Sequence, residues 1–139
     1  YPIYSDEDAG KREADYNEIR LAEIYYSLAE CKFKANDVDG AAKLLNAVRK
    51  RNYPQDTWAE YLYKPEGTVT LTQDELYDEW GREFLAEGRR RTDLIRWGLY
   101  CTEEWWDKKP DADSHWDIFP IPRDMMGADH TLKQNPGYN

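Results

Sequence analysis

The stretch from residue 79 to residue 98 constrains the fold most, because two side-chain series recur there with the period of a helix. Carboxylates recur every fourth residue, at Glu79, Glu83 and Glu87. Apolar side chains recur with the same period, at Leu76, Trp80 and Phe84. Residues that are four apart share one face of an α-helix. One helix is therefore predicted to carry an apolar stripe beside an acidic stripe.

Arginines lie close to the acidic stripe, and they favour a structural interpretation of it. We predict an ion-pair network that holds helices together, with the members Arg82, Glu83, Glu87, Arg89, Asp93 and Arg96. The alternative is a pair of catalytic carboxylates of the glycoside hydrolase type. A neighbouring guanidinium favours the ionised form of a carboxylate, which is wrong for a general acid. We therefore expect no catalytic residue and no enzymatic activity.

Composition argues against several classes of protein. The 139 residues make one domain or one piece of a larger one. The net charge of −9 argues against nucleic-acid binding. The sequence has no apolar run near the ~20 residues of a membrane-spanning helix. Its two cysteines, Cys31 and Cys101, lack metal-site spacing, so we expect no metal and no cofactor. Whether these cysteines form a disulfide is left open by the sequence.

Hydrophobic periodicity predicts an all-α chain. Helices are expected at about residues 17–35, 39–51, 73–88 and 89–98, with a tail or linker at 1–15, a loop at 52–71 and an irregular segment at 99–139. Thr72 and Glu75 form a capping box before the third helix. The short turn after the first helix makes the first two helices antiparallel neighbours, as in one tetratricopeptide-type unit. The predicted class is tetratricopeptide-like helix pairs with long irregular loops.

The first predicted helix shows two adjacent apolar rows. One row contains Leu21, Tyr25 and Leu28. The other row contains Ala22, Tyr26, Ala29 and Phe33. Two adjacent rows make a broad apolar face, so we expect neighbours to cover this helix on more than one side.

The long connection over residues 52–71 is rich in aromatic side chains, which argues against disorder there. Loops of this length inside compact domains often carry function. We predict a ligand-binding role for Trp58, Tyr61 and Tyr63, because flat rings can form the apolar wall of a sugar site. The alternative is that these rings fold back onto the helices.

Five segments stand out by their order and spacing along the chain. They are RLAEIYYSLAE at Arg20–Glu30, LLNAVRKR at Leu44–Arg51, REFLAEGRRRTDLIRWG at Arg82–Gly98, FPIPR at Phe119–Arg123 and QNPGY at Gln134–Tyr138. Each segment alone is a weak signal, whereas the ordered set is specific. The set resembles the C-terminal region of the SusD/RagB family, and it places residues 16–139 in such a region.

The resemblance implies a mostly helical, non-catalytic protein that binds oligosaccharides or polysaccharides. It implies nutrient uptake together with a SusC-like TonB-dependent outer-membrane transporter. It also implies a surface-exposed protein of the cell outer membrane, lipid-anchored through an N-terminal part absent from this chain. No binding residue transfers by motif, so Trp58, Tyr61 and Tyr63 rest on composition alone. The alternatives are a helical-repeat scaffold for protein interaction and, ranked last, a glycoside hydrolase.

Overall fold

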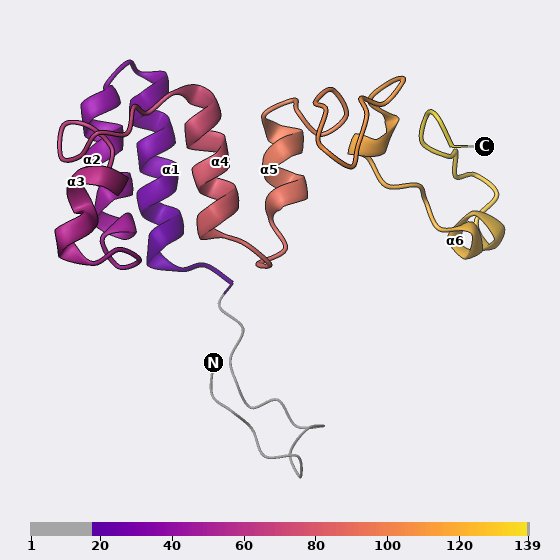
Figure 1. Ribbon diagram of the computed structural model, residues 1–139. Helices are drawn as coiled ribbons and strands as arrows, with labels where there is room; N and C mark the ends of the chain where they lie inside the picture. Colours follow the sequence, from indigo (N-terminus) through magenta and orange to yellow (C-terminus); the bar gives the residue numbers. More distant parts are fainter. Residues whose placement is uncertain (1–17, 139) are drawn as a thin grey trace, which may run out of the picture. The chain divides into compact units, whose positions relative to one another are not determined.

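The computed structural model describes residues 18–138, and the predicted tail at residues 1–15 lies outside this range. Within residues 18–138 every regular element is helical and no strand is present. The elements are α1 (Leu21–Lys34), α2 (Val38–Arg49), η2 (Gln55–Thr57), α3 (Trp58–Tyr61), α4 (Gln73–Glu83), α5 (Arg90–Arg96), η3 (His115–Asp117) and α6 (Arg123–Ala128), where η marks a 3-10 helix (Figure 1). The predicted all-α class is confirmed.

The chain divides into two compact units, and the division falls between Tyr77 and Asp78, inside α4. The N-terminal unit contains α1, α2, η2, α3 and the start of α4. The C-terminal unit contains the rest of α4 and the elements that follow it. Each unit buries large side chains of its own, with Tyr26 in the first unit and Trp80 in the second. Each unit therefore has its own apolar core.

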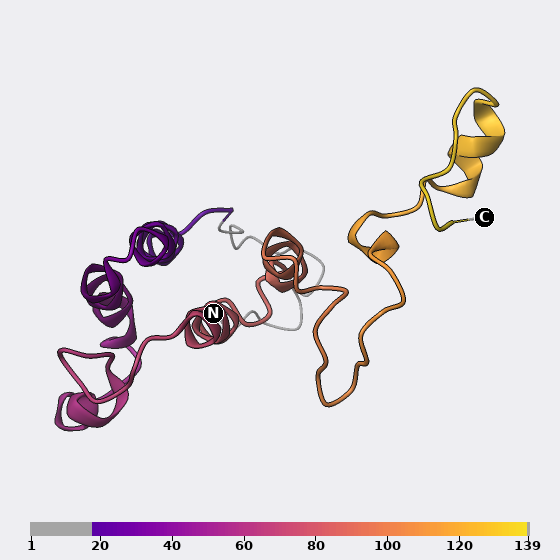
Figure 2. The ribbon, with the colours of Figure 1, turned by 90° about the horizontal axis from the view of Figure 1, so that it is seen from above.

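Small side chains let α1 and α2 pack side by side in the N-terminal unit (Figures 1 and 2). The buried small residues are Ala22 and Ala29 of α1 and Ala41 and Ala42 of α2. Only residues 35–37 separate the two helices. A connection this short makes them antiparallel neighbours, and the predicted tetratricopeptide-like pair is confirmed.

Only one of the two apolar rows predicted for α1 is buried within residues 18–138. The buried row is the one that contains Tyr26 and Ala29, which have no exposed surface. Leu21 and Leu28 of the other row are exposed, and Tyr25 is half-buried. We expected neighbours to cover both rows of α1. Within the described part of the chain, neighbours cover one row and leave the other largely exposed.

Thr72 stands immediately before the first residue of α4, in the position of its N-cap. The backbone N–H of Glu75 donates to Thr72 Oγ1 at 3.1 Å. The N–H of Leu76 donates to the Thr72 carbonyl at 2.9 Å. A threonine at this position satisfies an N–H of the first turn that has no partner inside the helix, so α4 begins where the capping signal places it.

The end of α4 differs from the sequence prediction, since the helix stops at Glu83 and not near residue 88. Ala86 and Gly88 have φ values of 63° and 77°, in the left-handed region. Such residues cannot continue a right-handed helix. The chain therefore turns after α4, and α5 begins at Arg90.

Cys101 is buried in the C-terminal unit, and its thiol donates to Asp117 Oδ1 at 3.3 Å. Burial, assisted by this carboxylate, raises the pKa of the Cys101 thiol above its usual value. Cys31 is exposed on α1, and both cysteines are free thiols. The disulfide that the sequence left open is therefore not formed.

Candidate functional site

The aromatic loop over residues 52–71 is held against α2 by the buried side chains of Asn46 and Arg49. The Asn46 amide donates to the Tyr63 carbonyl and accepts from the Tyr63 N–H, both at 2.9 Å. The Arg49 guanidinium donates to the Tyr61 carbonyl through Nε at 3.1 Å and Nη2 at 2.7 Å. Neither anchor is predicted by the sequence pattern, and together they give the loop a fixed path across α2.

Tyr63 lies in the interior of the N-terminal unit, with 0% of its surface exposed. Its hydroxyl donates to Glu75 Oε1 at 2.8 Å and accepts from Arg49 Nη1 at 3.1 Å. A fully buried ring offers no surface to a sugar. Any role of Tyr63 in ligand binding would therefore be to hold the loop in place.

Tyr53, Trp58 and Tyr61 form a partly exposed cluster of rings that we call the loop face. Tyr61 is 38% exposed, and its ring stacks on Tyr53 with 4.8 Å between centroids and 12° between planes. The Trp58 indole N–H donates to the Tyr53 carbonyl at 2.9 Å. The negative charge of Glu60, together with a hydrogen bond to its carboxylate, raises the pKa of the Tyr61 hydroxyl.

Charged groups border the loop face. Lys50 Nζ lies 4.9 Å from the centroid of the Trp58 ring, and it also pairs with the Glu66 carboxylate. The hydrogen bond from Lys50, with a smaller contribution from Asn46, lowers the pKa of Glu66. Rings beside fixed polar groups are what a sugar site requires, since the rings pack on C–H groups and the polar groups bind hydroxyls.

Asp93 is buried in the C-terminal unit between two arginines. It accepts from Arg89 through Nε at 3.3 Å and Nη2 at 3.4 Å, and from Arg96 Nε at 2.9 Å. The guanidinium carbons of Arg89 and Arg96 lie 4.9 Å and 5.1 Å from the centroid of the Trp80 ring. One carboxylate thus orients two cations that pack on one indole.

The glutamates of the acidic stripe differ in their surroundings. Glu79 is buried and accepts from Arg82 Nε at 2.8 Å. Glu83 and Glu87 are half-buried, and neither is without a partner. The membership of Glu83 and Glu87 in one network with Asp93 stays a prediction.

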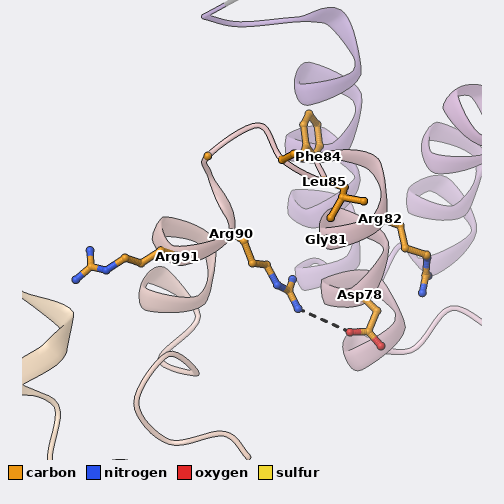
Figure 3. A pocket seen from close by; sticks show the side chains of 9 residues that line it. Asp78, Gly81, Arg82, Phe84, Leu85, Arg90 and Arg91 are labelled. Atoms are coloured by element: carbon orange, nitrogen blue, oxygen red, sulfur yellow. Dashed lines mark ion pairs between the residues drawn. The ribbon is translucent and has the colours of Figure 1, made fainter. Parts of the chain in front are cut away.

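A pocket of about 620 Å³ lies between the end of α4 and the start of α5 (Figure 3). Arg90 points toward Asp78 across this pocket, with 3.8 Å between Nη2 and Oδ1. Arg91 points away from it and donates to the Trp116 carbonyl at 2.6 Å. Among the described residues that line the pocket, Asp78 is the only carboxylate. Most glycoside hydrolases use two carboxyl groups roughly 5–10 Å apart, and the described lining of this pocket supplies one.

Residues 18–138 contain neither a candidate cluster of metal ligands nor a helix that could cross a membrane. No group of three or more His, Cys, Asp and Glu side chains in this range could hold a metal ion. The helices of the same range are also too short or too polar to span a bilayer. The longest of them, α1, has 14 residues, whereas a span needs ~20.

Comparison with known proteins identifies the family of the chain. A family model described as the SusD family matches residues 4–138. The starch-binding protein SusD of Bacteroides thetaiotaomicron is 37% identical over 132 residues, which cover 86% of this chain and 21% of that protein. The SusD-like protein P25 of Formosa agariphila is 36% identical over 82 residues, which cover 58% of this chain and 15% of that protein. The chain thus spans a small part of each relative's length, and it belongs to the SusD family.

Proposed function

We propose that this chain is part of a non-catalytic protein that binds glycans. The observation that carries the proposal is the 37% identity to a protein whose name states starch binding. The loop face supports it, because partly exposed rings lie there beside charged groups. An α-glucan is therefore the first glycan to test.

We also propose that the whole protein works at the outer-membrane surface, held by a lipid anchor, in nutrient uptake with a SusC-like TonB-dependent transporter. Membership of the SusD family supports this arrangement. Affinity purification of the whole protein from solubilised outer membranes should recover a transporter of that type. Recovery of the protein alone, under conditions that keep other outer-membrane complexes intact, would contradict the partnership.

Within this chain we assign the sugar contacts to the loop face. Tyr61 and Trp58 offer the partly exposed rings. The buried Tyr63 anchors the loop to α2 through its hydrogen bonds with Asn46. Tyr61→Ala is expected to weaken the binding of maltoheptaose to this face at least tenfold, or by ~1.4 kcal/mol, because the ring that a pyranose would stack on is removed. Isothermal titration calorimetry measures the change.

Trp106→Ala is the matched control for the loop face. Trp106 is 96% exposed and lies in the C-terminal unit, so its removal should leave the affinity unchanged. Absence of binding by the wild-type chain to maltoheptaose, cellohexaose and xylohexaose would contradict the assignment of sugar contacts to this chain. Release of reducing ends during incubation would contradict a non-catalytic role.

A helical-repeat scaffold for protein interaction is the second candidate, and the surface of α1 favours it. Leu21, Ile24 and Leu28 of α1 are exposed, together with Ile19 just before the helix. These positions follow the spacing of a helix-packing face. Under this function, Leu21→Glu would abolish the binding of the partner protein, whereas Tyr61→Ala on the loop face would leave it unchanged.

A further inference from the structure

A separate pocket of about 610 Å³ lies in the C-terminal unit. It is lined by residues of η3, of the segment 120–122, of α6 and of the segment 134–138, and we call it the C-terminal pocket. Its volume falls within the roughly 300–1,000 Å³ of small-molecule sites. Neither the loop face nor the predicted ion-pair network contributes a residue to it.

The C-terminal pocket has an aromatic wall built from three rings. Trp116 packs against His115, with 4.4 Å between centroids, and meets Tyr138 edge-on at 5.8 Å. His115 and Tyr138 also meet edge-on, at 5.1 Å. Trp116 is still 49% exposed despite these contacts. An indole held by two neighbours and half open to solvent can receive an apolar ligand surface without reordering.

Hydrogen bonds fix the backbone around this wall. The Tyr138 hydroxyl donates to the Ile118 carbonyl at 2.8 Å. The Gln134 amide accepts from the Ile121 N–H at 2.7 Å and donates to the Ile121 carbonyl at 2.9 Å. Gly137 has a φ of 88°, and a Cβ there would lie 2.5 Å from His115 Cβ. The pocket is therefore preformed, and glycine is required where the C-terminal segment approaches η3.

Polar groups lie at the same pocket. Arg123, at the start of α6, lines the pocket and is exposed. His115 contacts the Asp113 carboxylate through Nδ1, and the hydrogen bonds from the His115 backbone and ring lower the pKa of Asp113. The guanidinium can donate to hydroxyl oxygens. The Asp113 charge close by disfavours an acidic ligand.

We propose that the C-terminal pocket is a carbohydrate subsite that takes one neutral pyranose unit of a glycan. The sugar stacks its C–H face on Trp116, and its hydroxyl oxygens accept hydrogen bonds from Arg123. An aromatic wall beside a side-chain donor suits a polar ligand with an apolar face. This inference rests on the proposed glycan binding but concerns a surface other than the loop face.

Calorimetry on four variants of the full chain tests the subsite, with maltoheptaose, cellohexaose and xylohexaose as probes. The wild type is expected to bind two oligosaccharides per chain. Trp116→Ala and Arg123→Ala should each bind one, because the C-terminal pocket loses its stacking surface or its donor. Tyr61→Ala should bind one by losing the loop face. Trp106→Ala, which removes an exposed indole outside the pocket, should bind two.

The outcomes separate the two proposals. Wild-type stoichiometry and affinity in both Trp116→Ala and Arg123→Ala would overturn the subsite and leave the loop face intact. No heat from the wild type with any of the three probes would overturn both the loop face and this subsite as sugar sites of the chain. Circular dichroism of each variant checks the fold. If Trp116→Ala does not fold, Arg123→Ala still tests the subsite, because it leaves the three-ring wall in place.

Discussion

Asn46→Ala is expected to lower the free energy of unfolding by about 2–4 kcal/mol. The residue is fully buried, and its amide makes reciprocal hydrogen bonds of 2.9 Å to the backbone of Tyr63. Alanine removes both bonds, and a buried polar group that loses its partner costs about 1–3 kcal/mol. Urea denaturation followed by circular dichroism measures the loss as a lower midpoint at an unchanged slope.

Asn52→Ala provides the matched control for this prediction. Asn52 is an exposed asparagine just beyond the C-terminal end of α2. Its replacement should change stability by less than about 0.5 kcal/mol, as is usual for surface sites. Equal stabilities of the two alanine variants would show that Asn46 does not hold the loop against α2.

The regular part of the fold could be predicted because its signals are local. The two apolar rows predict α1 and include its buried row of Ala22, Tyr26 and Ala29, and the capping signal at Thr72 predicts the start of α4. The end of α4 could not be predicted in the same way. Glutamates keep the helical period up to Glu87, and alanine is a strong helix former, yet Ala86 adopts a left-handed conformation. These local signals therefore do not mark the end of α4.

The candidate site could be predicted only in part, because burial in the loop depends on contacts that are distant in sequence. Tyr61 and Tyr63 are two residues apart and have the same side chain, yet one is partly exposed and the other is fully buried. The difference follows from Asn46 and Arg49 on α2, which bond to this stretch. Trp116 was missed because the irregular segment around it has no period from which neighbours could be inferred.

Asp93→Ala is expected to cost about 1.5–3 kcal/mol of stability, because two partly exposed guanidiniums lose the buried carboxylate that they share. Asp93 is buried, and it accepts from Arg96 Nε at 2.9 Å and from Arg89 Nε at 3.3 Å. Both arginines pack on the Trp80 ring, so their repulsion would act on the core of the C-terminal unit. Chemical denaturation of the variant against the wild type measures the loss.

The same substitution separates a structural role from a binding role. If Asp93 only holds the C-terminal unit together, Asp93→Ala at a temperature where it is folded should bind maltoheptaose with wild-type affinity. Asp93→Asn keeps the shape of the side chain and removes its charge. If the charge stabilises the unit, Asp93→Asn should lose most of the stability that Asp93→Ala loses. Asp107→Ala removes an exposed carboxylate and should be nearly neutral. A fully stable Asp93→Ala protein that no longer binds glycan would place Asp93 in a ligand site, and the structural interpretation of the arginine pairs would then be wrong.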